Sequence, residues 1–281
     1  MPTPPRTLLF VSAERPERFD KAVASGADVV CIDLEDAVHP ERKDAARAAA
    51  ITYLLGRAAG AGSGPRLALR VNATKTLAGL RDVLALAEAG ARMDVLLLPK
   101  AESAQELEAL HAWLPQAFTE LVALVETPLG VERATEIAAA SRHGAPRLSA
   151  LMLGGADLSM ELGARFDWDG LLSARGRLVN AARAWGLQAW DVPFIDIADE
   201  AGLVQETRRV LDLGFDCKAA IHPTQIAPMH AVFRPAQREV DWARGVCAAA
   251  AAGGQGAFLY EGRMVDAPLL RRAERILQRA H

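Results

Sequence analysis

Short apolar runs alternate with longer amphipathic segments along almost the whole chain. Each run has the length of a strand, is rich in Val, Ile and Leu, and is followed by a segment long enough for a helix. The runs lie at residues 7–11, 28–33, 66–71, 94–99, 121–125, 150–154, 187–190 and 217–221. Continuous apolar runs of this length are typical of parallel strands that are buried on both faces. The pattern therefore predicts an α/β fold, a (β/α)8 barrel.

The segments between the runs predict the helices of this barrel. We expect helices at residues 16–25, 40–59, 76–89, 103–114, 130–141, 173–185 and 199–213. In the third, Leu77, Leu80, Leu84 and Ala87 recur at helical spacing. The Gly-rich stretch 60–64 follows a helix instead of opening one, so it predicts a turn and not a phosphate-binding loop.

The chain continues beyond the eighth run. Residues 223–232 and 236–252 look helical, Gly253–Gly256 suggests a hinge, and the tail 257–281 ends in an amphipathic helix. We therefore expect a catalytic barrel at residues 1–233 and a C-terminal helical extension and lid at residues 234–281. A helix that simply packs against the outside of the barrel is the alternative for this tail.

Composition narrows the class of protein. The 281 residues are 51% hydrophobic, enough for one large core, and the formal charge of −3 gives no positive field that would favour nucleic acid. Neither an apolar leader nor a long apolar span is visible, so we expect a cytoplasmic protein that does not enter a membrane. The widely spaced Cys31, Cys217 and Cys247 are interpreted as reduced core residues.

Polar side chains follow the predicted strands, at the end of a barrel that carries the chemistry. They are Arg15, Asp33, Glu35, Asp36, Arg70, Asn72, Lys100, Glu126, Asp157, Asp191 and His222. Glu126 and Asp157 end neighbouring strands, whose ends lie about 5 Å apart. A pair of carboxylates suits Mg²⁺, which binds one or two carboxylates together with waters and substrate oxygens. The sequence therefore predicts a magnesium site at Glu126 and Asp157, although either acid alone would suit a salt bridge or a helix cap.

Other residues at the strand ends suggest further roles. Glu35 and Asp36 fit a role in holding metal-bound waters, and Asp36 alternatively caps the next helix. Asp33 either joins them or forms an ion pair inside the barrel mouth. The backbone N–H groups near Gly155 and Ala156 could hold a substrate carboxylate.

Two cations and a histidine complete the predicted mouth. Arg70 ends the third strand, where a guanidinium gives bidentate recognition of a carboxylate or enolate oxygen. Lys100 either balances substrate charge or pairs with an acid, and His222 is expected to be a hydrogen-bonded residue at a strand end. Zinc and a serine nucleophile are disfavoured, because no second His or Cys and no Ser-His-Asp pattern accompanies these residues.

With these residues in place, nearly the whole chain resembles the citrate lyase beta subunit and the malyl-CoA and citramalyl-CoA lyases of the HpcH/HpaI aldolase superfamily. The resemblance is carried by Arg6-Thr-Leu-Leu-Phe-Val, Ala27-Asp-Val-Val-Cys-Ile-Asp-Leu-Glu-Asp-Ala-Val, Arg70-Val-Asn, Leu98-Pro-Lys, Val125-Glu-Thr-Pro, Gly154-Gly-Ala-Asp-Leu, Asp191-Val-Pro-Phe and Ala220-Ile-His-Pro. Val11-Ser-Ala-Glu-Arg departs from the Val-Pro-Gly that the family often has after its first strand.

The resemblance implies a Mg²⁺-dependent lyase that cleaves a malyl-CoA or citramalyl-CoA type of substrate into an acyl-CoA and a 2-oxo acid, with thioester hydrolysis as a further activity. It implies Mg²⁺ at Glu126 and Asp157, substrate contact by Arg70, and Arg15 near the CoA entrance. It also implies a homo-oligomer, a trimer or hexamer, in which Asp266 of a lid reaches a neighbouring subunit's site. A CoA-independent Mg²⁺ aldolase and a non-catalytic carboxylate-binding subunit are the alternatives.

Overall fold

The computed structural model describes residues 4–58, 64–253 and 256–280, and the chain divides into two compact units. Residues 4–229 form the larger unit, and the described residues from 230 onward form the smaller one. Most of the stretch predicted as a turn at 60–64, and the middle of the stretch predicted as a hinge at Gly253–Gly256, lie outside the described residues. Each unit is considered by itself below.

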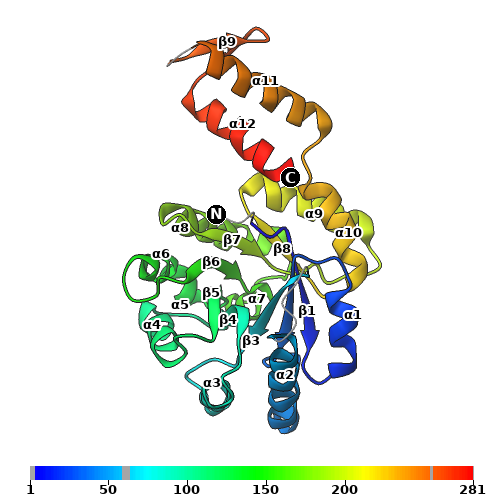
Figure 1. Cartoon of the computed structure of the whole chain (residues 1–281), viewed down its shortest axis with the longest axis vertical. Coiled ribbons are helices and arrows are strands. Elements are labelled where there is room, and N and C mark those ends of the chain that lie inside the picture. Colours follow the sequence, from blue (N-terminus) through cyan, green and yellow to red (C-terminus); the bar gives the residue numbers. More distant parts are fainter. Residues whose placement is uncertain (1–3, 59–63, 254–255, 281) are drawn as a thin grey trace. The chain divides into compact units, whose positions relative to one another are not determined.

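The larger unit is a closed barrel of parallel strands, as the alternating pattern predicts (Figure 1). The strands are β1 (Thr7–Ser12), β2 (Val29–Asp33), β3 (Arg66–Arg70), β4 (Met93–Leu98), β5 (Phe118–Val125), β6 (Leu148–Leu153), β7 (Gln188–Asp191) and β8 (Cys217–Ala220). Each strand pairs with the next in sequence, and β8 closes the barrel by pairing with β1. The predicted (β/α)8 fold is confirmed.

Helices surround this barrel (Figure 1). They are α1 (Phe19–Val23), α2 (Lys43–Ala58), α3 (Leu77–Ala89), α4 (Ala104–Trp113), α5 (Pro128–Glu132), α6 (Ala134–Ala139), α7 (Gly155–Leu162), α8 (Trp168–Ala184), α9 (Glu200–Leu213) and α10 (Ile226–Phe233). Short polar side chains cap several of them: Thr76, Ser103 and Asp199 each accept a hydrogen bond from a first-turn N–H of α3, α4 or α9. These caps stand where the predicted helices begin.

Apolar side chains fill the inside of the barrel. They come from alternate positions of the strands and form one buried cluster: Leu8, Val29, Cys31, Ala68, Val95, Leu97, Val122, Leu124, Ala150, Met152, Trp190, Cys217 and Ala219. Successive residues of a strand point to opposite sides, so the remaining apolar positions pack outward under the helices. Because the interior is packed, the site of a ligand must lie at one end of the barrel.

The leucine stripe of α3 faces solvent. Leu77, Leu80 and Leu84 are 65%, 49% and 58% exposed. The buried residues of α3 include Val83 and Leu86, which lie on a different face of the helix from that stripe. The helical spacing of the leucines is therefore real, but it marks an outer apolar face and not the face that covers the barrel. Apolar faces of this kind are common at contacts between subunits.

The smaller unit contains two packed helices and a hairpin. α11 (Gln237–Gly253) and α12 (Ala267–Ala280) lie side by side (Figure 1). In the segment that connects them, β9 (Phe258–Tyr260) pairs with β10 (Arg263–Val265) in antiparallel fashion. The apolar stripe predicted for the last helix packs on α11, through Leu269, Leu270, Ala273, Ile276 and Leu277. The stripe thus has a core of its own inside this unit.

The cysteines and the search for membrane-spanning helices can be compared with the expectations from the sequence. Cys31 and Cys217 are buried in the barrel core, and Cys247 is partly buried against the core of the smaller unit; all three are free thiols. Burial raises the pKa of both Cys31 and Cys217, which keeps these thiols unreactive. Among the helices in the described ranges, none is both long and apolar enough to cross a membrane.

Candidate functional site

A cavity opens at the carboxyl ends of the barrel strands. Its volume is 340 Å³, and its lining combines charged side chains with apolar walls. The charged residues are Asp33, Asp36, Arg70, Glu126 and Asp157. The walls include Phe10, Leu124, Met152, Phe166, Pro193, Ile195 and Ile221. Polar groups that converge in an apolar cavity are the usual form of a small-molecule site, and this is the end of a barrel where such sites lie.

Three carboxylates meet beside this cavity. One oxygen each from Glu35, Glu126 and Asp157 lies within 4.8 Å of the other two. Glu126 directly follows β5, and Asp157 lies in the first turn of α7 after β6. The register of β5 and β6 sets Val125 beside Leu153, so the two strands deliver these acids to one place. The structure thus brings the two predicted metal ligands together and adds Glu35 to them.

Lys100 lies between these carboxylates. Its ammonium Nζ is 2.5 Å from Glu35 Oε1 and 2.7 Å from Asp157 Oδ2, and it is 3.8 Å from Glu126 Oε1. Burial alone would lower the pKa of Lys100, but the hydrogen bonds to Asp157 and Glu35 raise it overall. Pairing with acids, one of the two roles expected for this residue, is therefore the one seen.

Arg70 is held by Asp33. The register places Asp33 of β2 beside Arg70 of β3, and Arg70 donates from Nε and Nη2 to the two carboxylate oxygens at 2.7 and 2.6 Å. The predicted ion pair of Asp33 in the barrel mouth is present. Arg70 Nη1 lies 2.9 Å from Glu35 Oε2, and the guanidinium stands 5.0 Å from the ring centroid of Phe10. The edge of Arg70 that can make a bidentate contact is thus occupied by Asp33, and Nη1 faces Glu35.

Lys43 and Asp82 hold the segment that carries Glu35 in place, a role that the sequence did not indicate for either residue. Lys43 Nζ donates to the carbonyls of Leu34 and Glu35 and to Asn72 Oδ1, each at 2.7 Å. Asp82, from α3, accepts from the backbone N–H and the side-chain amide of Asn72. A lysine in a charged first turn and an aspartate within a helix look like solvated residues in a sequence, so only the fold shows their role.

The two glycines before Asp157 give room to the site. A Cβ at Gly154 would lie 2.3 Å from Glu126 Cβ and Oε2, and one at Gly155 would lie 2.7 Å from Phe166. Gly154 also precedes α7, whose first N–H groups at Gly155 and Ala156 have no helical carbonyl to bind. A helix N-terminus favours anions, which agrees with the expected role of these two residues.

Burial and mutual repulsion shift the protonation of the cluster. Burial, and next the charge of Glu35, raises the pKa of Glu126 to about 8, although Lys100 and Arg70 act in the opposite direction. Burial likewise raises the pKa of Glu35. Strongly perturbed acids in a cavity are typical of functional sites. A cation that joins the cluster would favour the ionised forms.

The residues of the cluster fit magnesium. All three donors are hard carboxylate oxygens, which Mg²⁺ prefers, and Glu35 Oε2 is buried without a hydrogen bond despite its ion pair with Arg70. Mg²⁺ binds its oxygens at about 2.0–2.1 Å, in octahedral geometry that leaves positions for waters and substrate.

Several predicted residues are not members of the cluster of Glu35, Glu126 and Asp157. Asp191 is fully buried and pairs with Arg175 at 2.8 Å and Lys218 at 3.1 Å, not with the cluster. His222 accepts from the N–H of Thr224, so the expectation of a hydrogen-bonded strand-end residue is confirmed. Arg15 is exposed and lies 4.0 Å from Glu17. Asp36 is exposed and lies near Arg70 and Lys100. The alternative that Asp36 caps the next helix is wrong, because the side chain of His39 accepts the hydrogen bond at that helix start.

Asp266 belongs to the smaller unit. It is exposed and accepts a hydrogen bond from the N–H of Leu269 at 3.2 Å, which caps α12. This cap explains why an acid stands there, and it leaves the second carboxylate oxygen available for other partners. Its predicted catalytic role stays a prediction.

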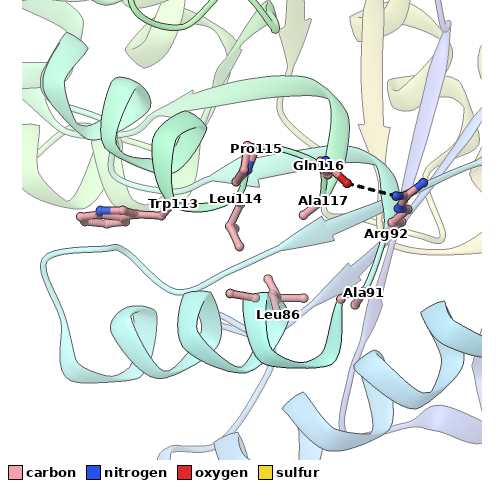
Figure 2. A pocket seen from close by; sticks show the side chains of 10 residues that line it. Leu86, Ala91, Arg92, Trp113, Leu114, Pro115, Gln116 and Ala117 are labelled. Carbon is pink, nitrogen blue, oxygen red and sulfur yellow. Dashed lines mark hydrogen bonds between the residues drawn. The ribbon is translucent and has the colours of Figure 1, made fainter.

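A second cavity, of 270 Å³, lies at the opposite end of the strands. Figure 2 shows Leu86 and Leu114 pointing toward each other, while Arg92 donates to Gln116 at 3.3 Å near the starts of β4 and β5. Of its lining residues, Arg92 alone carries a charge. This composition offers no metal ligands or acid–base pair, so we place the chemistry in the cavity at the carboxyl ends.

Comparison with known proteins agrees with this geometry. The family model described as HpcH/HpaI aldolase/citrate lyase matches residues 6–223. The chain is 40% identical over 279 residues to a citrate lyase subunit beta-like protein of Mycobacterium tuberculosis, covering 97% of this chain and 94% of that protein. It is 34% identical over 317 residues to the L-malyl-CoA/beta-methylmalyl-CoA lyase of Cereibacter sphaeroides, covering 99% and 96%.

A solved structure extends the likeness to three dimensions. The CitE protein of Mycobacterium tuberculosis, in complex with magnesium, acetoacetate and coenzyme A, is 39% identical to this chain. The superposition has a TM-score of 0.83 and covers 100% of this chain and 99% of that one. That protein is thus similar to this one along the whole length, the smaller unit included.

The raised pKa of Glu126 predicts a proton release. Mg²⁺ binds the carboxylate form, so at pH values below about 8 metal binding should displace a proton, and Mg²⁺ affinity should rise as the pH is raised toward 8. Because the folded pKa lies above the value of 4.5 usual for Glu, the metal-free fold should lose stability as the pH rises from 4.5 to about 8. Calorimetric titration with Mg²⁺ near neutral pH, in two buffers of different ionisation enthalpy, counts the proton. Binding without proton release would contradict the assignment.

Proposed function

Because the chain belongs to the HpcH/HpaI aldolase/citrate lyase family, we propose that it is a Mg²⁺-dependent carbon–carbon lyase that acts on a CoA ester. The substrate is of the malyl-CoA or citramalyl-CoA type, and the products are an acyl-CoA and a 2-oxo acid. The observation that carries this proposal is the convergence of Glu35, Glu126 and Asp157 at the carboxyl ends of the strands. Glu126, Asp157 and Arg70 line the cavity there.

Glu126 and Asp157 hold the metal in this proposal. Mg²⁺, when bound there, polarises the hydroxyl oxygen that becomes a carbonyl and orients the neighbouring carboxylate. The first N–H groups of α7, at Gly155 and Ala156, receive that carboxylate. Glu35 stays between Arg70 and Lys100, while Asp33 and Asp36 complete the acidic surroundings of the metal. The apolar walls of the cavity exclude water from the acyl part of the substrate.

Arg70 stabilises the negative charge that develops as the carbon–carbon bond breaks. Asp33 fixes its Nε–Nη2 edge. Nη1 lies 2.9 Å from Glu35 Oε2, and because this nitrogen carries two hydrogens, the second is the donor for the enolate oxygen of the thioester. A two-point contact with substrate, as the sequence suggested, would require Arg70 to release Asp33. Because Asp33 already holds Arg70 in position, little reorganisation energy is spent on orienting this donor during the reaction. In this proposal Arg15, which is exposed after β1, lies near the entrance for CoA.

Asp266 supplies the proton for the acyl-CoA α-carbon, acting as acid in cleavage and as base in condensation. We place it over the site of a neighbouring subunit in a homo-oligomer, a trimer or hexamer. Two apolar faces support assembly: the leucine stripe of α3, and the cross-strand pair of Leu259 and Met264, which are 76% and 69% exposed. Hydrolysis of the thioester after condensation is a further activity that the same site could support.

The proposed function is tested with purified protein and single substrates. Malyl-CoA, citramalyl-CoA, citrate and a CoA-free hydroxy-oxo acid are incubated separately with and without Mg²⁺, and the products are resolved by mass. We expect cleavage of a CoA ester that needs Mg²⁺ and stops in EDTA. Cleavage of the CoA-free acid alone would assign a CoA-independent aldolase. Binding of carboxylates without turnover of any substrate would assign a non-catalytic subunit.

Replacing Arg70 tests its role. In Arg70→Lys, one ammonium cannot both hold Asp33 at two oxygens and present a donor to substrate, so we expect kcat/KM to fall on the order of 10²-fold. Arg66→Lys is the matched control, because Arg66 lies on the same strand and pairs with Glu120 at the other end. Steady-state kinetics of both variants are compared. If Arg70→Lys behaves like Arg66→Lys, Arg70 only stabilises the fold.

Mixing inactive subunits tests the shared site. Asp266→Asn should keep the cap of α12, since Asn is as good a cap as Asp, but should abolish proton exchange at the α-carbon. Oligomers that combine Asp266→Asn with Arg70→Ala subunits should recover part of the activity, because each mixed pair contains one intact site. The control combines Arg70→Ala with Glu126→Gln, both in the barrel, and should stay inactive. Mixed oligomers verified by native mass spectrometry that recover nothing would exclude a shared Asp266.

A further inference from the structure

Lys100 places a positive charge where the three carboxylates would place a metal ion. Its Nζ is bonded to Glu35 at 2.5 Å and to Asp157 at 2.7 Å, and it stands 3.8 Å from Glu126. These are the same three acids whose oxygens lie within 4.8 Å of one another. Oxygens this close together leave space for one cation, because a second cation at the same point would be repelled by the first.

The backbone of Lys100 is held by hydrogen bonds, and its side chain extends from there to the carboxylates. Lys100 has φ of 51°, in the left-handed region that a side chain disfavours. Its N–H donates to Glu126 Oε1 at 2.8 Å, and the next N–H, of Ala101, donates to the carbonyl of Leu124 at 3.0 Å. These bonds hold the turn after β4 in place. The side chain, 28% exposed, reaches from this turn to the carboxylates. Its four rotatable bonds allow Nζ to change partners while the backbone stays in place.

We propose that Lys100 is a built-in counter-ion that competes with Mg²⁺ for Glu126 and Asp157. This inference rests on the proposed function, because it takes those two acids as the metal ligands. Mg²⁺ binds oxygen at about 2.0–2.1 Å, whereas the ammonium already lies 2.7 Å from the carboxylate of Asp157. A divalent ion on Glu126 and Asp157 would stand within a few ångströms of Nζ, and two cations so close repel strongly in a partly buried site.

Metal binding therefore requires Nζ to move away from Asp157. The acids left for it are Glu35, which it already contacts, and the exposed Asp36, whose Oδ1 is 3.9 Å away. This movement separates the roles of the three carboxylates. Glu126 and Asp157 go to the metal, and Glu35 keeps the lysine. Lys100 is a positioning residue in this account: it holds the ligands together before the metal arrives and weakens the apparent affinity of the metal.

The variant that tests this proposal is Lys100→Met, with Lys100→Gln as a second neutral variant in case the first does not fold. Both side chains are unbranched, as lysine is, so they meet the same backbone constraint at φ of 51°. Lys100→Arg keeps the positive charge. Lys75→Met is the control, because Lys75 forms an exposed ion pair with Glu102 away from the cluster.

Two measurements are made on the full-length protein: Mg²⁺ affinity by calorimetric titration, with Mn²⁺ binding followed by electron paramagnetic resonance, and the thermal unfolding midpoint in EDTA and in saturating Mg²⁺. We expect the neutral Lys100 variants to bind Mg²⁺ on the order of tenfold more tightly or better. They should also unfold at a lower temperature than the parent in EDTA, and saturating Mg²⁺ should narrow that difference. Lys100→Arg and Lys75→Met should stay near the parent in affinity.

The outcomes separate this inference from the proposed function. Unchanged or weaker Mg²⁺ binding by folded Lys100→Met or Lys100→Gln would overturn the competition and would mean that Lys100 helps to hold the metal. A parent protein that binds neither Mg²⁺ nor Mn²⁺ would overturn both the metal site of the proposed function and this inference. Activity is not needed for either conclusion.

Discussion

Repulsion among carboxylates at the mouth of the barrel is the constraint on which the site depends. In the described part of that mouth, Asp33, Glu35, Asp36, Glu126 and Asp157 stand close together, and several are buried. Like charges at such distances cannot all stay ionised without compensation. Arg70 compensates Asp33, and Lys100 bridges Glu35 and Asp157, yet burial still raises the pKa of Glu126 to about 8. The site therefore favours a further cation.

The rest of the barrel serves to keep these charges in place. The register of β2 and β3 sets Asp33 beside Arg70, and Gly154 leaves room for the side chain of Glu126. Lys43 donates hydrogen bonds to the carbonyls of Leu34 and Glu35 and so holds this segment in place. A buried ion pair contributes little net stability against an apolar pair of the same size, but loss of one partner is costly. Such pairs fix geometry, which is what an electrostatic site requires.

The barrel could be predicted from the sequence because its strands are buried on both faces and thus read as unbroken apolar runs. Glu126 and Asp157 could be predicted to meet for the same reason, since neighbouring strands end side by side. The boundaries of elements that contain polar residues, and the short helices, were harder to predict from the sequence. β5 begins at Phe118, earlier than expected, because the polar Thr119 and Glu120 interrupt the run. The short α7 has too few turns to display a period.

Contacts between distant residues could not be predicted. Nothing near Asp191 in the sequence indicates that Arg175 and Lys218 bury and neutralise it away from the cavity. The helical spacing of Leu77, Leu80 and Leu84 does not tell an outer apolar face from a core face. Lys100 was expected either to balance substrate charge or to pair with an acid, and only the fold shows that it meets Glu35 and Asp157 together.

The central claim is that a divalent cation is bound where Glu126 and Asp157 converge. The most direct measurement is the anomalous diffraction of Mn²⁺ in crystals grown with this ion in place of Mg²⁺. The account predicts one strong peak in the barrel mouth, within direct coordination distance of carboxylate oxygens of both Glu126 and Asp157. A mouth without a peak, or a peak bound by neither acid, would contradict it.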